Sequence, residues 1–354
     1  MSMSQASNKS LVQGGPEPLI PWNNPYDPIN YHAFQQFNLI SQCVIKPLFL
    51  LPGIPSNVVN CLVFWRQGLR DRINLCLFCL ALADLLYLLS LIAITQIGPF
   101  AELVNELLGK EIYYKSVQYG IWFRSEMRTM SGCITLVLSI ERCVCVYFPL
   151  RAASLMKTRS MAALLSSIYV ITQGGFVYSF FRYEVTVKRN NMTNQVISWN
   201  LDLSTTHRSN YTLFRTLEIL LLTVLPLCIF ATICLATSLT IVKLRAAILW
   251  RQTTSSSSSD SHAQQVMLIK MLVLVSCLYI VGGTPYVILL LLSAFLPGFD
   301  LGGRYQNSFL TMGVLAVIFT CFNSSFNCVI YYRQSSRYRT EVQAMYCCKR
   351  SKVG

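Results

Sequence analysis

Seven long apolar segments run through the sequence, and each is long enough to cross a lipid bilayer, which takes about 20 residues. They lie at residues 39–65, 73–98, 117–147, 161–182, 213–245, 264–296 and 308–332. Because every backbone polar group has to be satisfied inside lipid, we expect all seven to be α-helices. The sequence therefore predicts an all-α membrane protein with a seven-transmembrane helix bundle over residues 39–332.

The composition agrees with a membrane protein and excludes other classes. Hydrophobic residues make up 53% of the chain and charged residues 12%, whereas a soluble domain carries about 25% charged residues. The net charge of +14 is high enough for a nucleic-acid binder, but such a protein would not be this apolar. A membrane protein with one strongly basic face explains both numbers, so we expect membrane lipid and no nucleic acid as a partner.

The positive charges predict the orientation of the bundle. With the N-terminus outside, the inner segments hold fifteen Lys or Arg, with Lys243 and Arg245 included, against three acids. The outer segments hold eight of each. Since positive residues favour the cytoplasmic side, we expect segment 1–38 to be extracellular and segment 333–354 to be cytoplasmic.

Three Asn-x-Ser/Thr sequons support this orientation, because glycosylation acceptors belong on the outer side. They begin at Asn8, Asn191 and Asn210, and all three fall in outer segments. We therefore expect a multi-pass protein of the plasma membrane that is glycosylated at these three residues.

The fourteen cysteines are not distributed as a disulfide framework, because none of them lies in a predicted outer loop. The chain also has no metal-ligand spacing and no Gly-rich phosphate loop. We expect no outer disulfide, no metal site, no cofactor and no enzymatic activity.

Short polar motifs interrupt the apolar segments at regular places. They are Asn57 in SNVVNCLVF, Asp84 in LALADLL, Ser131, the Glu141-Arg142-Cys143 run, Pro226, Pro285, and Asn327 and Tyr331 in NSSFNCVIYY. The stretch RQSSRYRTEV, with Tyr338, follows directly. Over residues 40–345 these motifs resemble the rhodopsin-like (class A) G-protein-coupled receptor family, and the pattern is also similar to invertebrate chemosensory or peptide receptors.

The resemblance implies a fold, two partners and several roles. The fold would be seven helices and a short amphipathic eighth helix, and the partners would be an extracellular ligand and a heterotrimeric G protein. Glu141 would hold Arg142 at rest, and activation would free Arg142 while Tyr331 moves inward. Cys347 and Cys348, after the eighth helix, would be palmitoylated.

The resemblance also implies a buried polar hub. It would consist of Asp84, Ser131, Asn323 and Asn327. Oxygen ligands suit a hard cation, so the hub would hold a sodium ion or, alternatively, a network of water.

Several positions depart from the family pattern. Val117 stands where the family has a disulfide-forming Cys, and residues 183–212 contain no Cys to pair with it. Gly283 replaces a large aromatic residue, Cys328 replaces a Pro, and Gln265 stands where an acid would lock Arg142. These departures indicate a divergent branch of the family.

Two arginines lie one turn apart on the third helix. Arg124 is eighteen residues before Arg142, which places it about 27 Å away along the helix axis. Arg128 follows on the same face. A charge at mid-bilayer costs about 2.5–3.5 kcal/mol even on lenient scales, so both side chains should face water or a partner. We expect them to grip an anionic group of the ligand, or alternatively to pair internally with Glu218. Glu126 points away from Arg124 around the helix.

Three other functions were weighed against a receptor that binds a peptide or small anionic ligand. A retinal photoreceptor is rejected, because residues 308–332 contain no Lys for a Schiff base. A transporter would show repeats, and none is apparent. A receptor-like protein that no longer signals stays open because of the altered motifs in the sixth and seventh helices.

Overall fold

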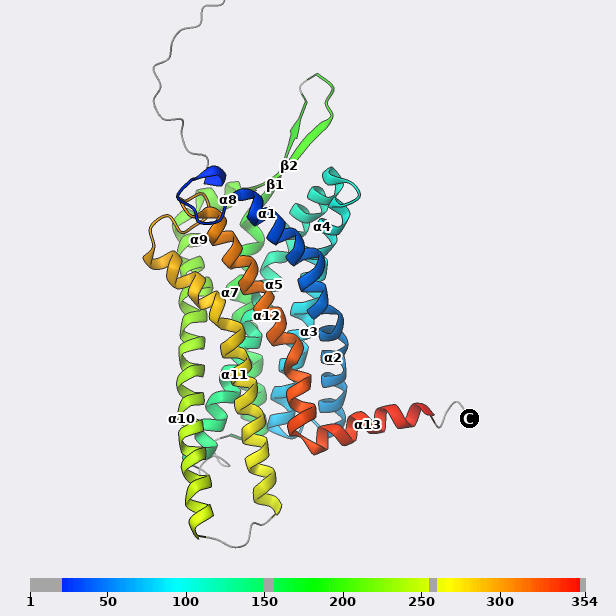
Figure 1. Ribbon diagram of the computed structural model, residues 1–354, viewed down its shortest axis with the longest axis vertical. Helices are drawn as coiled ribbons and strands as arrows, with labels where there is room; N and C mark the ends of the chain where they lie inside the picture. Colours follow the sequence, from blue (N-terminus) through cyan, green and yellow to red (C-terminus); the bar gives the residue numbers. More distant parts are fainter. Residues whose placement is uncertain (1–20, 149–155, 191, 255–259, 351–354) are drawn as a thin grey trace, which may run out of the picture.

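The computed structural model describes residues 21–148, 156–190, 192–254 and 260–350 of the 354-residue chain. Within these residues, seven helices are long and apolar enough to cross a membrane. They are Tyr31–Gln67, Arg72–Glu102, Glu106–Tyr147, Thr158–Phe181, Tyr211–Leu249, Val266–Phe295 and Gln306–Gln334. The predicted seven-helix membrane bundle is thus confirmed, and its helices stand side by side along the long axis (Figure 1).

Several of the seven spans are divided by short turns of other helix types. The first consists of α1 (Tyr31–Ile40), a π-helical turn (Ser41–Ile45) and α2 (Lys46–Gln67). The second consists of α3 (Arg72–Leu91), a π-helical turn (Ile92–Gln96) and α4 (Ile97–Glu102). The third is α5 (Glu106–Tyr147), and the fourth is α7 (Thr158–Phe176) with a 3-10 turn (Val177–Phe181). The fifth consists of α9 (Tyr211–Glu218), a π-helical turn (Ile219–Val224) and α10 (Leu225–Thr254). The sixth and seventh are α11 (Asp260–Phe295) and α12 (Gln306–Gln334).

The third helix begins eleven residues earlier than the predicted residue 117, and the reason is local. Asn105 caps its first turn by accepting a hydrogen bond from the backbone N–H of Leu108. Two Glu–Lys pairs at i,i+4 spacing support the next turns. These residues are polar, so the helix extends past the apolar segment from which its start was predicted.

A β-hairpin that was not predicted lies between the fourth and fifth spans, as an addition to the predicted helical bundle. Strand β1 (Tyr183–Arg189) pairs antiparallel with β2 (Val196–Leu203), and the register joins Tyr183 to Leu203. A short helix, α8 (Thr205–Ser209), follows. The hairpin projects beyond the bundle (Figure 1), and we call this the hairpin end.

The predicted eighth helix is present as α13 (Ser336–Arg350), which leaves the opposite end of the bundle sideways (Figure 1). It is amphipathic in its first turns, because Tyr338 is buried while Arg337 and Arg339 are exposed. The ring of Tyr338 packs against Phe64 and Tyr331. We call this the α13 end.

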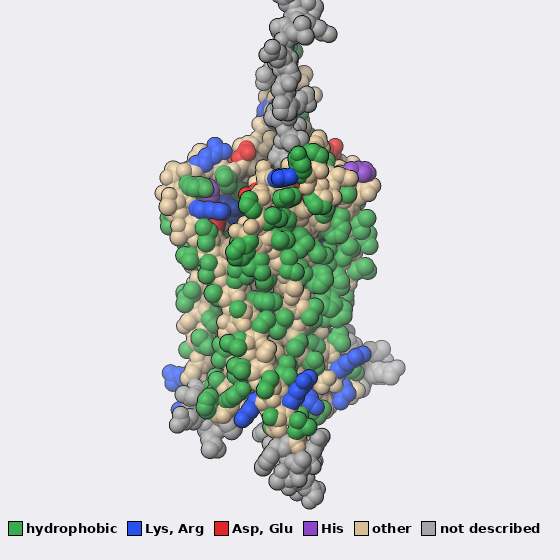
Figure 2. Space-filling view, turned by 60° about the vertical axis from the view of Figure 1, so that its left-hand side comes forward, with side chains coloured by type: hydrophobic (Ala, Val, Ile, Leu, Met, Phe, Trp, Pro, Cys, Tyr) green, Lys and Arg blue, Asp and Glu red, His purple; other side chains and the backbone are tan. Residues whose placement is uncertain are grey.

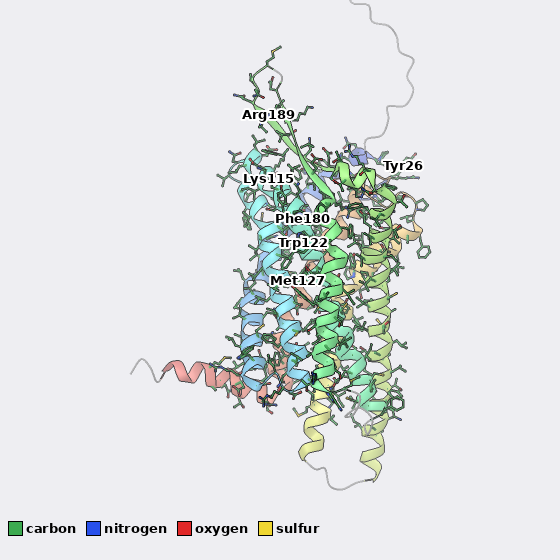
Figure 3. The ribbon with its side chains drawn as sticks, turned by 180° about the vertical axis from the view of Figure 1, so that it is seen from behind. Tyr26, Lys115, Trp122, Met127, Phe180 and Arg189 are labelled. Atoms are coloured by element: carbon green, nitrogen blue, oxygen red, sulfur yellow. The ribbon has the colours of Figure 1, made fainter. Side chains whose placement is uncertain are left out.

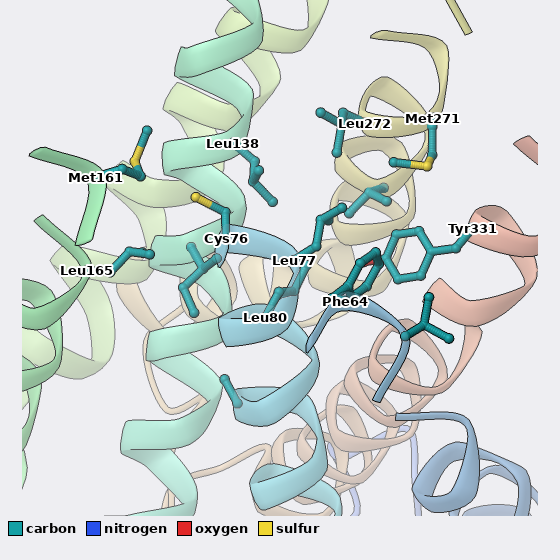
Figure 4. Packing of buried hydrophobic residues seen from close by; sticks show 14 of the residues in the cluster. Phe64, Cys76, Leu77, Leu80, Leu138, Met161, Leu165, Met271, Leu272 and Tyr331 are labelled. Carbon is teal, nitrogen blue, oxygen red and sulfur yellow. The ribbon is translucent and has the colours of Figure 1, made fainter. Parts of the chain in front are cut away.

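The largest buried apolar cluster lies toward the α13 end. Figure 4 shows side chains from α2, α3, α5, α7, α11 and α12 meeting there, among them Phe64, Leu77, Leu138, Leu272 and Tyr331. In the view of Figure 2, hydrophobic side chains cover the middle of the molecule, Lys and Arg lie at the α13 end, and Lys, Arg, acids and His lie together at the hairpin end. A packed core at this end fixes the α13-end portions of six helices relative to one another.

At the hairpin end, the segment before α1 is attached to α12. It includes a 3-10 turn, Pro21–Asn23. The buried carboxylate of Asp27 accepts hydrogen bonds from the backbone N–H groups of Asn307 (2.8 Å) and Ser308 (3.3 Å), at the start of α12. A carboxylate is stabilised at a helix N-terminus, so Asp27 acts as the anchor of this segment.

Candidate functional site

Helix α5 connects the two ends of the bundle and carries most of the predicted site residues. Arg124 and Arg128 lie on either side of its midpoint, and Ser131 lies about one turn beyond Arg128 toward the α13 end. Glu141 and Arg142 lie in its last two turns. The geometry therefore divides into three clusters along one helix.

At the α13 end, Glu141 binds two arginines. Its Oε2 accepts a hydrogen bond from Nε of Arg142 at 2.6 Å, and its Oε1 lies 2.8 Å from Nε of Arg72 in α3. Glu141 is 2% exposed and Arg142 is 6% exposed. Arg72 also donates to the backbone oxygen of Met156 at 2.8 Å. The predicted Glu141–Arg142 pair is formed, and Arg72 extends it to the connection between the third and fourth spans.

Sequence reasoning did not identify Arg72. A signal was present, because Arg72 directly precedes the predicted segment 73–98 and follows the helix cap Asp71. In the sequence, a cation at that position is indistinguishable from the other basic residues of the same face. Its contact with Glu141 becomes visible only in the folded chain.

A second contact at this end joins α5 to α11. The hydroxyl groups of Ser139 and Ser276 lie 2.8 Å apart, and both residues are buried. The side chain of Gln265, which replaces the expected acid, lies outside the described residues. The serine pair therefore provides a described polar link between the third and sixth spans on this side.

The polar hub forms around Asp84, which is completely buried. Its Oδ1 accepts hydrogen bonds from Ser131 and Ser324, each at 2.8 Å, and its Oδ2 accepts one from Asn327 at 2.9 Å. Asn323 makes no hydrogen bond to Asp84, so its predicted place in the hub is taken by its neighbour Ser324. Asn323 instead lies close to Gly282, where an added Cβ would be 2.6 Å from the Cβ of Asn323.

One further observation supports the binding of a small cation at the hub. The side-chain oxygen of Asn327 is buried and has no hydrogen-bond partner among the described residues. With Asp84 and Ser131 it offers oxygen ligands of the kind that a hard cation prefers. Sodium binding remains a prediction.

From the hub, a chain of polar side chains leads to α13. Asn57 donates to the backbone oxygen of Ser324 at 2.7 Å, and Asn60 donates to Asn57 at 3.2 Å. The hydroxyl of Tyr338 donates to Asn60 at 2.6 Å. Tyr331 packs edge-on against Phe64, and its buried hydroxyl has no partner among the described residues. Asn327 thus belongs to the hub, and Tyr331 packs on Phe64 and Tyr338 at the α13 side of this polar chain.

Toward the hairpin end, Arg128 is held by an aromatic residue of α11. Its guanidinium lies 4.1 Å from the ring centroid of Tyr286 and donates to the Tyr286 hydroxyl at 3.1 Å. That hydroxyl donates to the backbone oxygen of Leu222 at 2.9 Å. A cation over an aromatic face is attracted by the ring but keeps its full charge. Arg128 is therefore positioned without being neutralised.

Beside Arg128 is a small cavity of about 50 Å³ between α5, α10, α11 and α12. Gly283 lines it, and a Cβ added there would lie 3.3 Å from the ring of Phe230. The space that a large aromatic residue would occupy at this position is thus partly filled by Phe230 from α10.

Arg124 is partly buried and makes no hydrogen bond or ion pair within the described part of the chain. It is close enough to Arg128 for the two charges to repel each other. Tyr183, the first residue of β1, is also within electrostatic range. Burial raises the pKa of Tyr183 above its usual value, so its phenol stays neutral and does not balance Arg124.

The structure contradicts the alternative in which Glu218 pairs with Arg124 or Arg128. Glu218 is buried and binds Arg182 (3.1 Å), His207 (3.4 Å) and Arg215 (3.8 Å). Arg182 and His207 flank the hairpin, so Glu218 ties the base of the hairpin to the fifth span. This ion cluster fastens the hairpin to the fifth span, whereas the family's disulfide would fasten it to the third, and it leaves Glu218 outside the arginine site.

Glu126 is also separate from the arginines. It is completely buried, and both of its carboxyl oxygens lack a hydrogen-bond partner among the described residues. Figure 3 shows the neighbouring residues Trp122 and Met127 of α5, with Phe180 of the fourth span on the same side near the hairpin end. No ion pair between Glu126 and the two arginines occurs in the described ranges, so no acid of α5 neutralises them.

The predicted modification sites are described only in part. Asn8 and Asn191 lie outside the described residues, as do the side chains of Cys347 and Cys348. Asn210 is exposed at the hairpin end, between α8 and α9. Its place on the surface is compatible with the predicted glycosylation, which stays a prediction.

Comparison with known proteins gives one positive finding. Residues 44–349 match the family model described as serpentine type 7TM GPCR chemoreceptor Srw. A comparison with curated proteins found no match. The matched range covers all seven spans from the π-helical turn of the first onward, together with α13.

Proposed function

This chain belongs to the Srw family of serpentine seven-transmembrane G-protein-coupled chemoreceptors, and we propose that it detects an anionic extracellular ligand and activates a heterotrimeric G protein. A small carboxylate or a peptide with a free C-terminus is the ligand class, and Arg124 is its main anchor. The rhodopsin-like assignment made from the motifs is not needed for this proposal, because the family match alone gives a chemoreceptor with seven helices.

One observation carries the choice of an anion. Arg124 lies inside the bundle near the hairpin end, and the described residues provide no acid that pairs with it. An unpaired charge in a membrane protein is costly and marks a functional site by default. A guanidinium binds a carboxylate with two parallel hydrogen bonds, which supplies the missing charge and fixes its orientation. Amine ligands would be repelled.

The orientation and location follow from charge. Lys and Arg side chains lie at both ends in Figure 2, but acidic side chains accompany them only at the hairpin end, which supports a cytoplasmic α13 end and an extracellular hairpin end. In this orientation Asn210 faces outward, and Cys347 and Cys348 face the cytoplasm for palmitoylation. We place the protein in the plasma membrane.

Coupling to the G protein runs through Glu141 and Arg142. At rest Glu141 holds Arg142, and the serine pair Ser139–Ser276 keeps α5 and α11 together. Movement of α11 away from α5 breaks the serine contact and lets Arg142 leave Glu141 for the G protein. Arg72 stays on Glu141 during this step, so the buried carboxylate is never left without a cation. Asn327 and Tyr331 transmit the change from the hub, where Asp84, Ser131 and Asn327 would hold a sodium ion in the resting state.

The test is nucleotide exchange on G proteins in membranes that contain this chain. Small carboxylates and free-acid peptides are compared with amines and amidated peptides. We expect a response to acids that is abolished in Arg142→Ala and in Arg124→Ala, both at normal surface levels. A response to amines or amidated peptides alone would reject the anion anchor and keep the receptor. Silence toward every class, with surface expression confirmed, would favour a receptor-like protein that no longer signals.

A further inference from the structure

A lysine in the first span is buried inside the bundle. Lys46, the first residue of α2, is 3% exposed. It is the only charged residue of segment 39–65. Because an ionisable group inside a membrane is costly, its presence at such a depth of burial calls for a partner.

The described partners of Lys46 are neutral and too few. Its Nζ donates to Oε1 of Gln42 at 2.9 Å, and Nε2 of Gln96 donates to the same oxygen at 2.9 Å. A lysine ammonium has three donors, and only this one hydrogen bond is formed within the described residues. No carboxylate lies within ion-pair distance of Lys46 in those ranges.

The charges around Lys46 make its position less favourable still. Arg124 is close enough to repel it electrostatically, and Arg128 in turn repels Arg124. Three buried acids of the described residues leave these cations unpaired: Asp84 is bound to the hub, Glu218 is bound at the hairpin base, and Glu126 forms no ion pair. Like charges in a poorly solvated interior raise the free energy of the empty site. An anion that contacts both Lys46 and Arg124 lowers this electrostatic free energy at each of the two cations.

We propose that Lys46 is a second anion anchor and that the site formed with Arg124 takes a dianionic organic acid, with one acidic group on each cation. The inference rests on the proposed anion site at Arg124 and adds the number of negative charges in the ligand. Gln42 holds the ammonium by accepting its hydrogen bond at Oε1, and Gln96 fixes Gln42 by donating to the same oxygen; both glutamines are buried. Arg128, already positioned on Tyr286, adds positive potential without a direct role in gripping the second acid.

The experiment measures binding to the purified full-length chain by the ligand-dependent shift of its unfolding temperature. The probes are succinate, glutarate and adipate, each compared with its monomethyl ester, which keeps the length but removes one charge. We expect the best dicarboxylate to bind at least about tenfold more tightly than its monoester, as the loss of one close charge pair implies. In Lys46→Met this preference falls to about twofold or less, while binding of the monoester is retained.

Two controls keep the outcome interpretable. Lys46→Arg preserves the charge and should preserve the preference, which distinguishes charge from folding. Lys188→Met removes an exposed lysine of the hairpin and should change nothing. An unchanged preference in Lys46→Met would overturn the role of Lys46 and leave the Arg124 site intact. Failure of every acid to shift the wild-type protein would overturn both this inference and the anion site itself.

Discussion

Two clusters of buried charge, one toward each end of the bundle, differ in how their charge is balanced. At the α13 end, the carboxylate of Glu141 is held by Arg72 and Arg142, so the positive and negative groups are matched within the chain. At the hairpin end, Lys46 and Arg124 have no acid partner among the described residues. A cluster of balanced ion pairs stabilises one conformation, whereas a cluster of unpaired cations favours binding of an anionic ligand. The comparison assigns the resting lock to one end and the receiving site to the other.

The largest expected effect concerns the matched end. Glu141→Ala leaves Arg142 buried without a carboxylate, and breaking a buried pair in this way costs about 3–5 kcal/mol. The variant should unfold at a clearly lower temperature and show raised basal nucleotide exchange.

The matched control for this variant is Glu111→Ala, which removes a more exposed carboxylate paired with Lys115. Exposed pairs contribute about 0–1 kcal/mol, so its unfolding temperature should hardly change. Equal losses in the two variants would show that Glu141 is not a specially buried lock.

A smaller effect is expected from the contact between α5 and α11. Ser276→Ala removes the Ser139–Ser276 hydrogen bond, and such a bond contributes about 1 kcal/mol. Ser139 keeps a hydrogen bond to the backbone oxygen of Thr135, so no buried hydroxyl is orphaned. Basal exchange should rise, because the resting arrangement loses one of its links. Ser167→Ala, at an exposed serine of α7, is the control; an unaltered basal rate in Ser276→Ala would remove the serine pair from the switch.

The smallest effect concerns the hub. Replacing choline by sodium should raise the unfolding temperature of the wild-type chain slightly, since binding at a concentration equal to Kd contributes about 0.4 kcal/mol. Asp84→Asn should abolish the difference between the two salts. A sodium effect of the same size in that variant would place the ion elsewhere.

Much of the architecture could be predicted because the bilayer imposes strong rules. Apolar segments of sufficient length gave all seven spans, and the motif around Tyr338 gave the eighth helix. The ends were less predictable: α5 begins at Glu106 because of a polar cap and side-chain pairs that hydropathy does not register. The hairpin had a signal that was missed, namely the alternation of Tyr183, Val185 and Val187 with polar residues.

The site was predictable only where neighbours in the sequence are also neighbours in space. Glu141 and Arg142 are adjacent along α5, and their pair was predicted correctly. Ser324 entered the hub in place of Asn323 because the rotation of α12 decides which of two adjacent polar residues faces Asp84. Glu218 was assigned to the arginines because the sequence does not reveal that Arg182 and His207 fold back onto it.

The most direct measurement compares the unfolding temperature of the wild-type chain with that of Arg124→Gln, each with and without a dicarboxylate such as glutarate. Without glutarate, the variant should be at least as stable as the wild type, because it loses an unpaired charge that repels Lys46 and is repelled by Arg128. With glutarate, the wild type should gain stability and the variant should not. A variant that is less stable in the absence of ligand, or one that gains as much from glutarate as the wild type, would contradict the account of an unmatched site that waits for an anion.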